Sequence, residues 1–168
     1  MNATHRTAHR FMPVSLRIDG RNILVVGGGR LALHKTALIA RFTPRITVVA
    51  PRFDDGFRHT TFTLRHKEYS PDDLRDIFLV YACTDSDALN ARIRDDAAAQ
   101  GILASVCDNP ERCDFISPAI YINNNVTVSV SSDARRVRQS VRIRDDIRRL
   151  AEQGLLRISE DDTLPTDQ

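Results

Sequence analysis

The sequence lacks an apolar run long enough to cross a membrane, because no stretch reaches the ~18 apolar residues that a bilayer requires. It also lacks a strong charge of one sign: the formal net charge is only +2, which argues against a general nucleic-acid binder. The first residues, MNATHRTAHR, have none of the apolar character of a signal peptide and predict a disordered leader over residues 1–12. These absences favour a globular cytoplasmic protein that binds neither membrane nor nucleic acid.

Cysteine is also scarce. Cys83, Cys107 and Cys113 form no CxxC pair and are odd in number, so they predict reduced thiols rather than a disulfide framework. No metal site is expected. Cys113 is interpreted as a buried small residue, because no histidine stands near it to activate the thiol as a nucleophile. His34, within a helix-like stretch, is interpreted as a surface or packing histidine.

The chain does contain short apolar runs that alternate with helix-like stretches. Strands are expected at residues 23–26, 45–49, 61–66, 77–82 and 103–106, and helices at 31–42 and 87–100. Asp87 is the candidate cap of the second helix. Strands interleaved with helices indicate βαβ units and right-handed crossovers. The predicted fold class is therefore α/β, a Rossmann-like doubly wound parallel sheet.

The pattern changes after Cys113. The strings AIYI and VTVSVSS, joined by three asparagines, predict a β-hairpin, and a single charged helix is expected from Arg135 to about Leu150. An acidic tail, SEDDTLPTDQ, follows and looks disordered. Because an isolated hairpin is marginally stable in water, this region is expected to pack against a second copy of the chain as a homodimer.

The string ILVVGGGRLALHK, residues 23–35, places three glycines between a strand and a helix. Gly27, Gly29 and Ala32 fit the GxGxx(G/A) dinucleotide fingerprint, in which the second glycine lets the backbone approach a pyrophosphate. The alternative is a glycine-rich turn without a ligand. An acidic residue expected about 20 residues further on is missing, because the next strand ends in VVAPR. Recognition through the backbone and Arg52 leaves NAD and NADP both open.

A second motif, SVCDNPERCDFISPA at residues 105–119, begins where a strand ends. Asp108 is therefore expected at the carboxyl edge of the sheet, where a carboxylate could accept a proton as hydride leaves in the other direction. Asp-Asn-Pro is also ordinary turn chemistry, and the residues alone favour that simpler interpretation.

The last helix is rich in arginine. Four arginines are expected to share one face of it: Arg135, Arg138, Arg142 and Arg149. They form either a solvated face on a dimerisation helix or a set of guanidiniums that hold substrate carboxylates. Nucleic acid is the weaker alternative, because no aromatic residues are interleaved and Asp145 and Asp146 interrupt the run.

Five motifs together carry a resemblance. LVVGGGRLALHK, ITVVAP, VYACTDSDALN, VCDNPERCDFISPA and VTVSVSS, in this order from about Pro13 to Ser132, resemble the precorrin-2 dehydrogenase family. Its members are NAD-dependent modules that also form the N-terminal part of multifunctional siroheme synthases. The resemblance implies oxidation of precorrin-2 to sirohydrochlorin with NAD, and some members also insert ferrous iron. The family's essential aspartate falls on Asp108, and its strand ending VAP accounts for the missing acidic residue.

The same resemblance implies site residues and a domain division. The NAD contacts of the family fall on Gly27, Gly28, Gly29, Arg30, Leu31, Pro51 and Arg52, with Thr84 and Asp85 nearby. Substrate contacts are expected at Ser132, by the resemblance, and at Arg135 and Arg138. The expected division is a leader at 1–12, an NAD-binding domain at 13–114, a dimerisation region at 115–153 and an acidic tail at 154–168.

The sequence departs from the family pattern in three ways. The chain reads SSDARRVRQS where the family has SSGG and then proline, and Ser105 stands where an asparagine is usual. The helical module that usually follows is missing. The altered serine loop and the missing helical module favour an alternative, an NAD(H)-binding regulatory module without catalytic activity. The dehydrogenase remains the predicted function.

Overall fold

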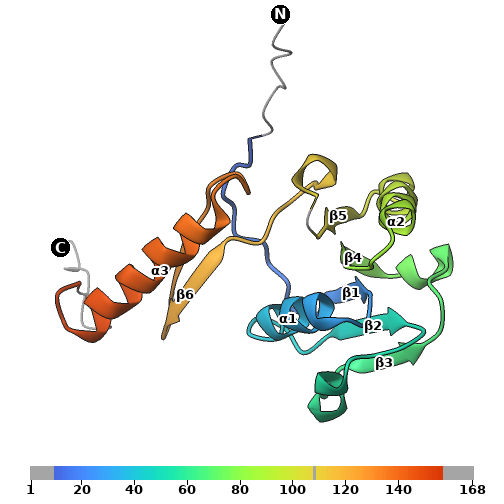
Figure 1. The fold of residues 1–168 in the computed structure, drawn as a ribbon, viewed down its shortest axis with the longest axis horizontal. Coiled ribbons are helices and arrows are strands. Elements are labelled where there is room, and N and C mark those ends of the chain that lie inside the picture. The colour runs from blue at the N-terminus through green and yellow to red at the C-terminus, as the bar shows by residue number, and fades with distance from the viewer. Residues whose placement is uncertain (1–9, 108, 157–168) are drawn as a thin grey trace, which may run out of the picture. The chain divides into compact units, whose positions relative to one another are not determined.

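The computed structural model describes residues 10–107 and 109–156, so the predicted leader and acidic tail lie mostly outside the described residues, and Asp108 lies outside them as well. The described chain forms two compact units (Figure 1). One spans Val14–Phe115, and the other combines residues 10–13 with residues 116–156. None of the helices in these ranges has the length and apolar character that a bilayer-spanning helix needs.

The first unit is built on a five-stranded parallel sheet of order β3-β2-β1-β4-β5 (Figure 1). Its strands are β1 (Asn22–Val26), β2 (Ile46–Ala50), β3 (Thr63–His66), β4 (Ile77–Ala82) and β5 (Leu103–Val106). Two helices, α1 (Arg30–Ile39) and α2 (Asp87–Ala99), connect them together with short 3-10 turns, η1 (Asp55–His59) and η2 (Pro71–Leu74). This confirms the predicted Rossmann-like α/β fold.

The alternation along β1 explains why helices cover both faces. Leu24 lies in a buried cluster with Ile93 of α2, whereas Val25 lies in a second cluster with Ala32 and Ile39 of α1. A fully buried leucine, valine or isoleucine side chain contributes about 1.5–3 kcal/mol. A strand that is buried on both faces must be apolar at every position. For this reason the apolar residues of these strands follow one another without interruption instead of alternating with polar residues.

Several of the predicted ends of helices and strands were wrong. α1 ends at Ile39 rather than at residue 42, because the N–H of Phe42 bonds to the carbonyl of Ile39 (2.9 Å) in a tighter turn. β3 begins at Thr63, two residues later than expected, and β2 runs one residue further, through Ala50. Asp87 does not cap α2: the hydroxyl of Ser86 accepts the N–H of Leu89 (3.2 Å) instead.

The second unit is an antiparallel hairpin and one helix. β6 (Ala119–Asn123) pairs with β7 (Val126–Val130), and the predicted asparagine turn is present with Asn124 in the left-handed region (φ 49°). The helix packs along both strands as α3 (Val137–Glu152), and Arg144 donates to the carbonyl of Ile120 (3.2 Å).

α3 starts two residues later than predicted, so Arg135 precedes it and does not share a helix face with Arg138. The reason is a turn in which Asp133 and Ala134 both have positive φ, 50° and 57°. The N–H of Arg136 donates to the hydroxyl of Ser132 (3.1 Å), which closes this turn before the helix begins.

The two units differ in their cores. Every buried apolar side chain of the described residues lies between Ile23 and Val106, in the first unit. Within residues 116–156, Ser140 alone is buried. Large apolar side chains of that unit stay exposed instead, including Val137 (60%) and Leu155 (73%). The hairpin and helix therefore have no dry core of their own.

Candidate functional site

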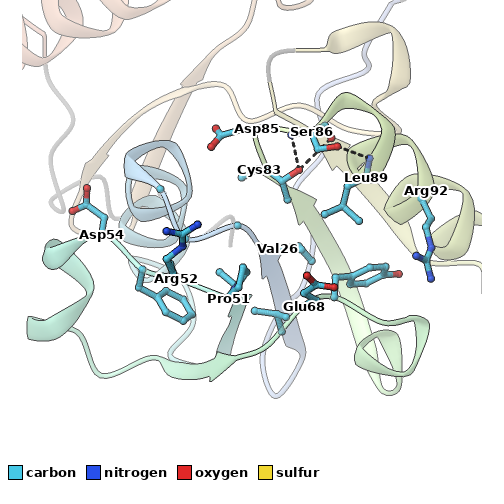
Figure 2. Close-up of a pocket in the computed structure, with 18 residues that line it drawn as sticks. Val26, Pro51, Arg52, Asp54, Glu68, Cys83, Asp85, Ser86, Leu89 and Arg92 are labelled. Atoms are coloured by element: carbon cyan, nitrogen blue, oxygen red, sulfur yellow. Dashed lines mark hydrogen bonds between the residues drawn. The ribbon is translucent and has the colours of Figure 1, made fainter.

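A pocket of about 780 Å³ opens at the carboxyl ends of β1, β2, β3 and β4, all within the first unit. Ligands bind at this edge in open α/β sheets. Figure 2 shows Pro51 and Arg52, after β2, on one side of it and Ser86 and Leu89, at the start of α2, on the other. The lining residues are Val26, Gly27, Gly28, Gly29, Val49, Ala50, Pro51, Arg52, Phe53, Asp54, Glu68, Tyr69, Cys83, Thr84, Asp85, Ser86, Leu89 and Arg92.

The three glycines of the loop serve different purposes. A Cβ at Gly27, whose φ is +129°, would overlap the carbonyl of Cys83, and one at Gly28 would overlap the carbonyl of Arg52. Both glycines are therefore required by the packing of the chain itself. A Cβ at Gly29 would meet no atom within 4 Å, and its φ of −84° suits any residue. Nothing among residues 10–107 and 109–156 requires the absence of a side chain at Gly29.

The start of α1 is suited to an anion. Gly29 is the N-cap residue, no side chain hydrogen-bonds to the first turn, and that turn contains no acidic residue. Backbone N–H groups at a helix start, together with the helix dipole, favour a negatively charged ligand. Arg30 and Leu31, both predicted contacts, open this helix but do not line the pocket.

The wall after β4 is held rigid by a residue that the sequence analysis missed. Asn90 is buried on α2, and its amide oxygen accepts both the N–H (3.1 Å) and the hydroxyl (2.7 Å) of Thr84. Its amide nitrogen donates to the Thr84 carbonyl (2.9 Å). A polar residue on the buried face of a predicted helix is the signal that could have identified Asn90. Thr84 and Asp85, both predicted, do line the pocket.

Charges of both signs lie around the pocket. Arg52 and Arg92 supply guanidiniums, and Asp54, Glu68 and Asp85 supply carboxylates, as Figure 2 shows. Asp54 also has a structural role, because its carboxylate accepts the N–H of Gly56 (3.0 Å).

Tyr69 also lines the pocket. Burial and the charge of Asp96, which accepts the Tyr69 hydroxyl (3.1 Å), raise the pKa of Tyr69. Its hydroxyl therefore stays neutral at physiological pH. Arg92 lies 3.6 Å from the same carboxylate.

The remaining predicted residues are not part of this pocket. Ser132, Arg135 and Arg138 belong to the second unit, where the Ser132 hydroxyl accepts both the Arg136 N–H (3.1 Å) and the Ser140 hydroxyl (2.9 Å). Cys113 is half-buried rather than buried. His34 is exposed, which selects the surface position from the two that the sequence left open, surface or packing.

Comparison with known proteins yields consistent matches. Residues 14–119 match a family described as "Putative NAD(P)-binding". A siroheme synthase of Nitrosococcus oceani is 35% identical over 127 residues, which cover 73% of this chain and 27% of that protein. A siroheme synthase of Ectopseudomonas mendocina is 38% identical over 125 residues, again 73% of this chain and 27% of the relative.

A solved structure titled "SirC, precorrin-2 dehydrogenase" superposes with a TM-score of 0.68 at 24% identity, covering 81% of this chain and 68% of that one. This match concerns the fold alone. The chain spans about a quarter of the length of these curated relatives.

Proposed function

The chain belongs to the NAD(P)-binding family that includes siroheme synthases, in their N-terminal region, and precorrin-2 dehydrogenase, and from this membership we propose that it oxidises precorrin-2 to sirohydrochlorin with NAD. The oxidation removes two hydrogens from the tetrapyrrole, one as a hydride and one as a proton. NAD, when bound, supplies the hydride acceptor. The protein must therefore bind a dinucleotide, bind a polycarboxylate and provide a base.

The observation that carries this proposal is the unfilled space beside Gly29 at the start of α1. The described part of the chain gives no reason for a glycine there, whereas a dinucleotide pyrophosphate placed against the backbone N–H groups does. The pocket volume of about 780 Å³ lies within the ~300–1,000 Å³ usual for ligand and cofactor sites. The residues present thus fit the cofactor.

NAD is proposed over NADP because of the charge around the pocket. Three carboxylates and two guanidiniums line it, and Arg92 already lies near Asp96. A further phosphate would meet an excess of negative charge. Glu68, which follows β3, is the side chain proposed to accept hydrogen bonds from the adenosine ribose. It would take the role of the acidic residue that the dinucleotide fingerprint places at the end of the second strand and that is missing after β2.

Asp108 is the proposed base. The chain leaves β5 at the edge where the pocket opens, since Val106 of β5 is paired with Ala82 of β4, and Cys83 and Thr84 then line the pocket. A carboxylate following Cys107 can accept the proton that the substrate loses with its hydride. A positioned base of this kind contributes roughly 10²–10⁴-fold to the rate.

The hairpin and α3 are proposed to form a two-fold homodimer. This unit buries no apolar side chain among residues 116–156, while Val126, Val141 and Leu150 remain exposed. Association would remove these side chains from water, at about 25 cal/mol per Å² of apolar surface. Arg138 and the neighbouring Ser132 turn are proposed to bind substrate carboxylates. A monomeric sedimentation profile at micromolar concentration would contradict the dimer.

The NAD(H)-binding regulatory module is the second candidate function, favoured by Asp133 and Ala134 where the family has two glycines. Both residues nevertheless adopt left-handed φ values of 50° and 57°, in the region that favours glycine. The turn is compatible with the backbone conformation that glycines would allow, at a cost of about 1–2 kcal/mol per residue. The substitution therefore does not argue against catalysis, and the dehydrogenase is preferred.

The test is anaerobic incubation of the protein with precorrin-2 and NAD, followed by the absorbance of sirohydrochlorin. We expect NAD-dependent product, lost in Asp108→Asn while the affinity for NAD stays unchanged. A parallel sample with ferrous iron shows whether siroheme follows. Absence of product despite NAD binding would favour the regulatory module, since that module requires Gly29 and is indifferent to Asp108.

A further inference from the structure

Asp96 of α2 does not line the pocket, but it contacts two residues that do, Tyr69 and Arg92. We propose that Asp96 sets the preference for NAD over NADP by neutralising Arg92, the guanidinium that would otherwise receive the 2′-phosphate of NADP. The inference rests on the proposed function, because it concerns the adenosine half of the bound dinucleotide. Asp96 itself touches neither cofactor. It is a positioning residue that acts through Arg92.

One oxygen of Asp96 brings together side chains from two walls of the pocket. Oδ2 accepts the hydroxyl of Tyr69, which lies in the segment after β3, at 3.1 Å. The same oxygen lies 3.6 Å from Nε of Arg92, which stands four residues earlier on α2. Tyr69 directly follows Glu68, the proposed ribose acceptor, and in the view of Figure 2 the Arg92 side chain runs from α2 down to the level of Glu68. Asp96 therefore holds Arg92 at the end of the pocket proposed for the adenosine.

The charge of Arg92 is balanced from outside the pocket. Within residues 10–107 and 109–156, Asp96 is the only carboxylate within 4.0 Å of the Arg92 guanidinium. A separation of 3.6 Å makes this an ion pair rather than a well-formed hydrogen bond. The Arg92 side chain is 58% exposed and that of Asp96 only 26%. The guanidinium thus reaches the pocket while a more buried carboxylate compensates its charge.

The fold itself gives little reason for a negative charge at position 96. An ion pair four residues apart adds little to a helix, and the order in which the arginine precedes the acid is the less favourable one. Burial and the charge of Asp96 raise the pKa of Tyr69, so the tyrosine hydroxyl stays the donor in their bond. That bond requires only an accepting oxygen, which an asparagine amide also supplies. The guanidinium of Arg92 is the partner that requires a carboxylate.

NADP differs from NAD by a phosphate on the adenosine ribose, which carries a charge of about −1.5 to −2 at pH 7. A nearby arginine is the usual partner of this phosphate, because its planar fork matches the phosphate oxygens. Here Asp96 already compensates the charge of Arg92, and Glu68 repels a phosphate directly. Without the charge of Asp96, Arg92 gains the freedom to form charge-assisted hydrogen bonds with the 2′-phosphate.

Asp96→Asn removes this charge and keeps an oxygen that can accept the Tyr69 hydroxyl. We expect the Kd for NADP, relative to the Kd for NAD, to fall at least fivefold in calorimetric titrations at one fixed salt concentration. Asp95→Asn is the matched control, because it removes the same charge from α2 at a carboxylate that lies 3.6 Å from Arg94. This control should shift the ratio less than twofold. The double variant Asp96→Asn/Arg92→Gln should return to the wild-type ratio, since the gain requires the guanidinium.

The ratio of the two Kd values separates this role from a merely structural one, which would weaken both dinucleotides alike. An unchanged ratio in Asp96→Asn would overturn the inference, as would an equal gain in Asp95→Asn or a gain that survives in the double variant. If Asp96→Asn does not fold, Arg92→Gln alone provides the test: the ratio should stay within twofold of wild type, and a selective loss of NADP affinity would overturn the inference.

These titrations need no turnover, so they also separate the inference from the proposed reaction. A wild-type protein that binds neither dinucleotide would contradict the proposed function and this inference with it. Binding of NAD without oxidation of precorrin-2 would contradict the dehydrogenase alone. A wild-type protein that binds NADP as tightly as NAD would overturn the inference and leave the dehydrogenase untouched.

Discussion

Replacing Gly29 with alanine is expected to separate cofactor binding from folding. The added methyl group meets no atom within 4 Å, and the backbone conformation at φ −84° suits alanine. The lower entropy of the unfolded chain stabilises the variant by about 0.4–1 kcal/mol, but alanine is a poorer N-cap than glycine by a similar amount. The free energy of unfolding should therefore change by less than about 0.5 kcal/mol, which shifts Tm by no more than ~2 °C.

The affinity for NAD should fall much further. The methyl group occupies the space beside the start of α1 and holds the pyrophosphate away from the backbone N–H groups. Losing one or two charge-assisted hydrogen bonds costs about 1.5–3 kcal/mol each, so Kd should rise at least tenfold. Gly28→Ala is the matched contrast, because its methyl group overlaps the carbonyl of Arg52 and lies 2.9 Å from the Cβ of Ala50. That variant should lose about 3 kcal/mol of stability or more.

Two measurements check this prediction. Thermal unfolding followed by circular dichroism gives the stability of the three proteins without NAD, and calorimetric titration at fixed salt gives Kd for NAD. A Gly29→Ala variant that binds NAD as tightly as wild type would refute the assignment of this loop to the pyrophosphate. A large loss of stability in Gly29→Ala would show that the space beside the loop is filled by the chain itself.

Three further predictions concern other parts of the molecule. Burial alone would raise the pKa of Asp73, but hydrogen bonds from Lys67, the Ser70 N–H and Arg65 outweigh it and hold that pKa below its usual value. The stabilisation is thus present above the unfolded-state pKa of about 3.9 and is lost as pH falls through the lower folded value; the urea midpoint should drop more steeply below pH 4 in wild type than in Asp73→Asn, and parallel profiles would contradict this. Ala134→Gly should raise the free energy of unfolding by about 1 kcal/mol, because it relieves the left-handed φ of 57°; an unchanged urea midpoint would contradict the strain. Glu68→Gln should raise the affinity for NADP relative to NAD by about threefold or more, since it removes one negative charge from the pocket; an unchanged ratio of Kd values would show that Glu68 does not read the ribose.

The sheet could be predicted from the sequence because its strands have only one stable environment. Runs such as Ile23–Val26 and Ile77–Ala82 are apolar at every position. Ile23–Val26 and the last four residues of β4, Leu79–Ala82, are buried on both faces, a pattern typical of parallel sheets. The helix ends were harder to predict. Ser86 and Asp87 are both good cap residues, and the choice between them depends on how the chain turns after Thr84.

The candidate site was only partly predictable for the same reason. The glycine loop can be recognised from the sequence, because its residues are contiguous and their spacing is specific. Asn90 can bond to Thr84, six residues earlier in the chain, only because α2 lies beside that residue in the fold. Cys113 bonds to backbone groups of Val106. Because every residue type carries such backbone groups, the sequence does not indicate which of them a side chain will bond to. Contacts of this kind are set by the fold rather than by local sequence.

Cys113 and Asp114 bond back to the edge strand β5, and this pairing bears on solubility. A strand with exposed N–H and carbonyl groups is a template on which another molecule can add a strand, the first step toward aggregation. Here Ala104 and Val106 are occupied by residues of the same chain. Oxidation of the Cys113 sulfur to a bulkier acid would break the bond to Val106 and expose part of that template. Oxidative damage at this one sulfur would then open part of the β5 edge to intermolecular β-pairing.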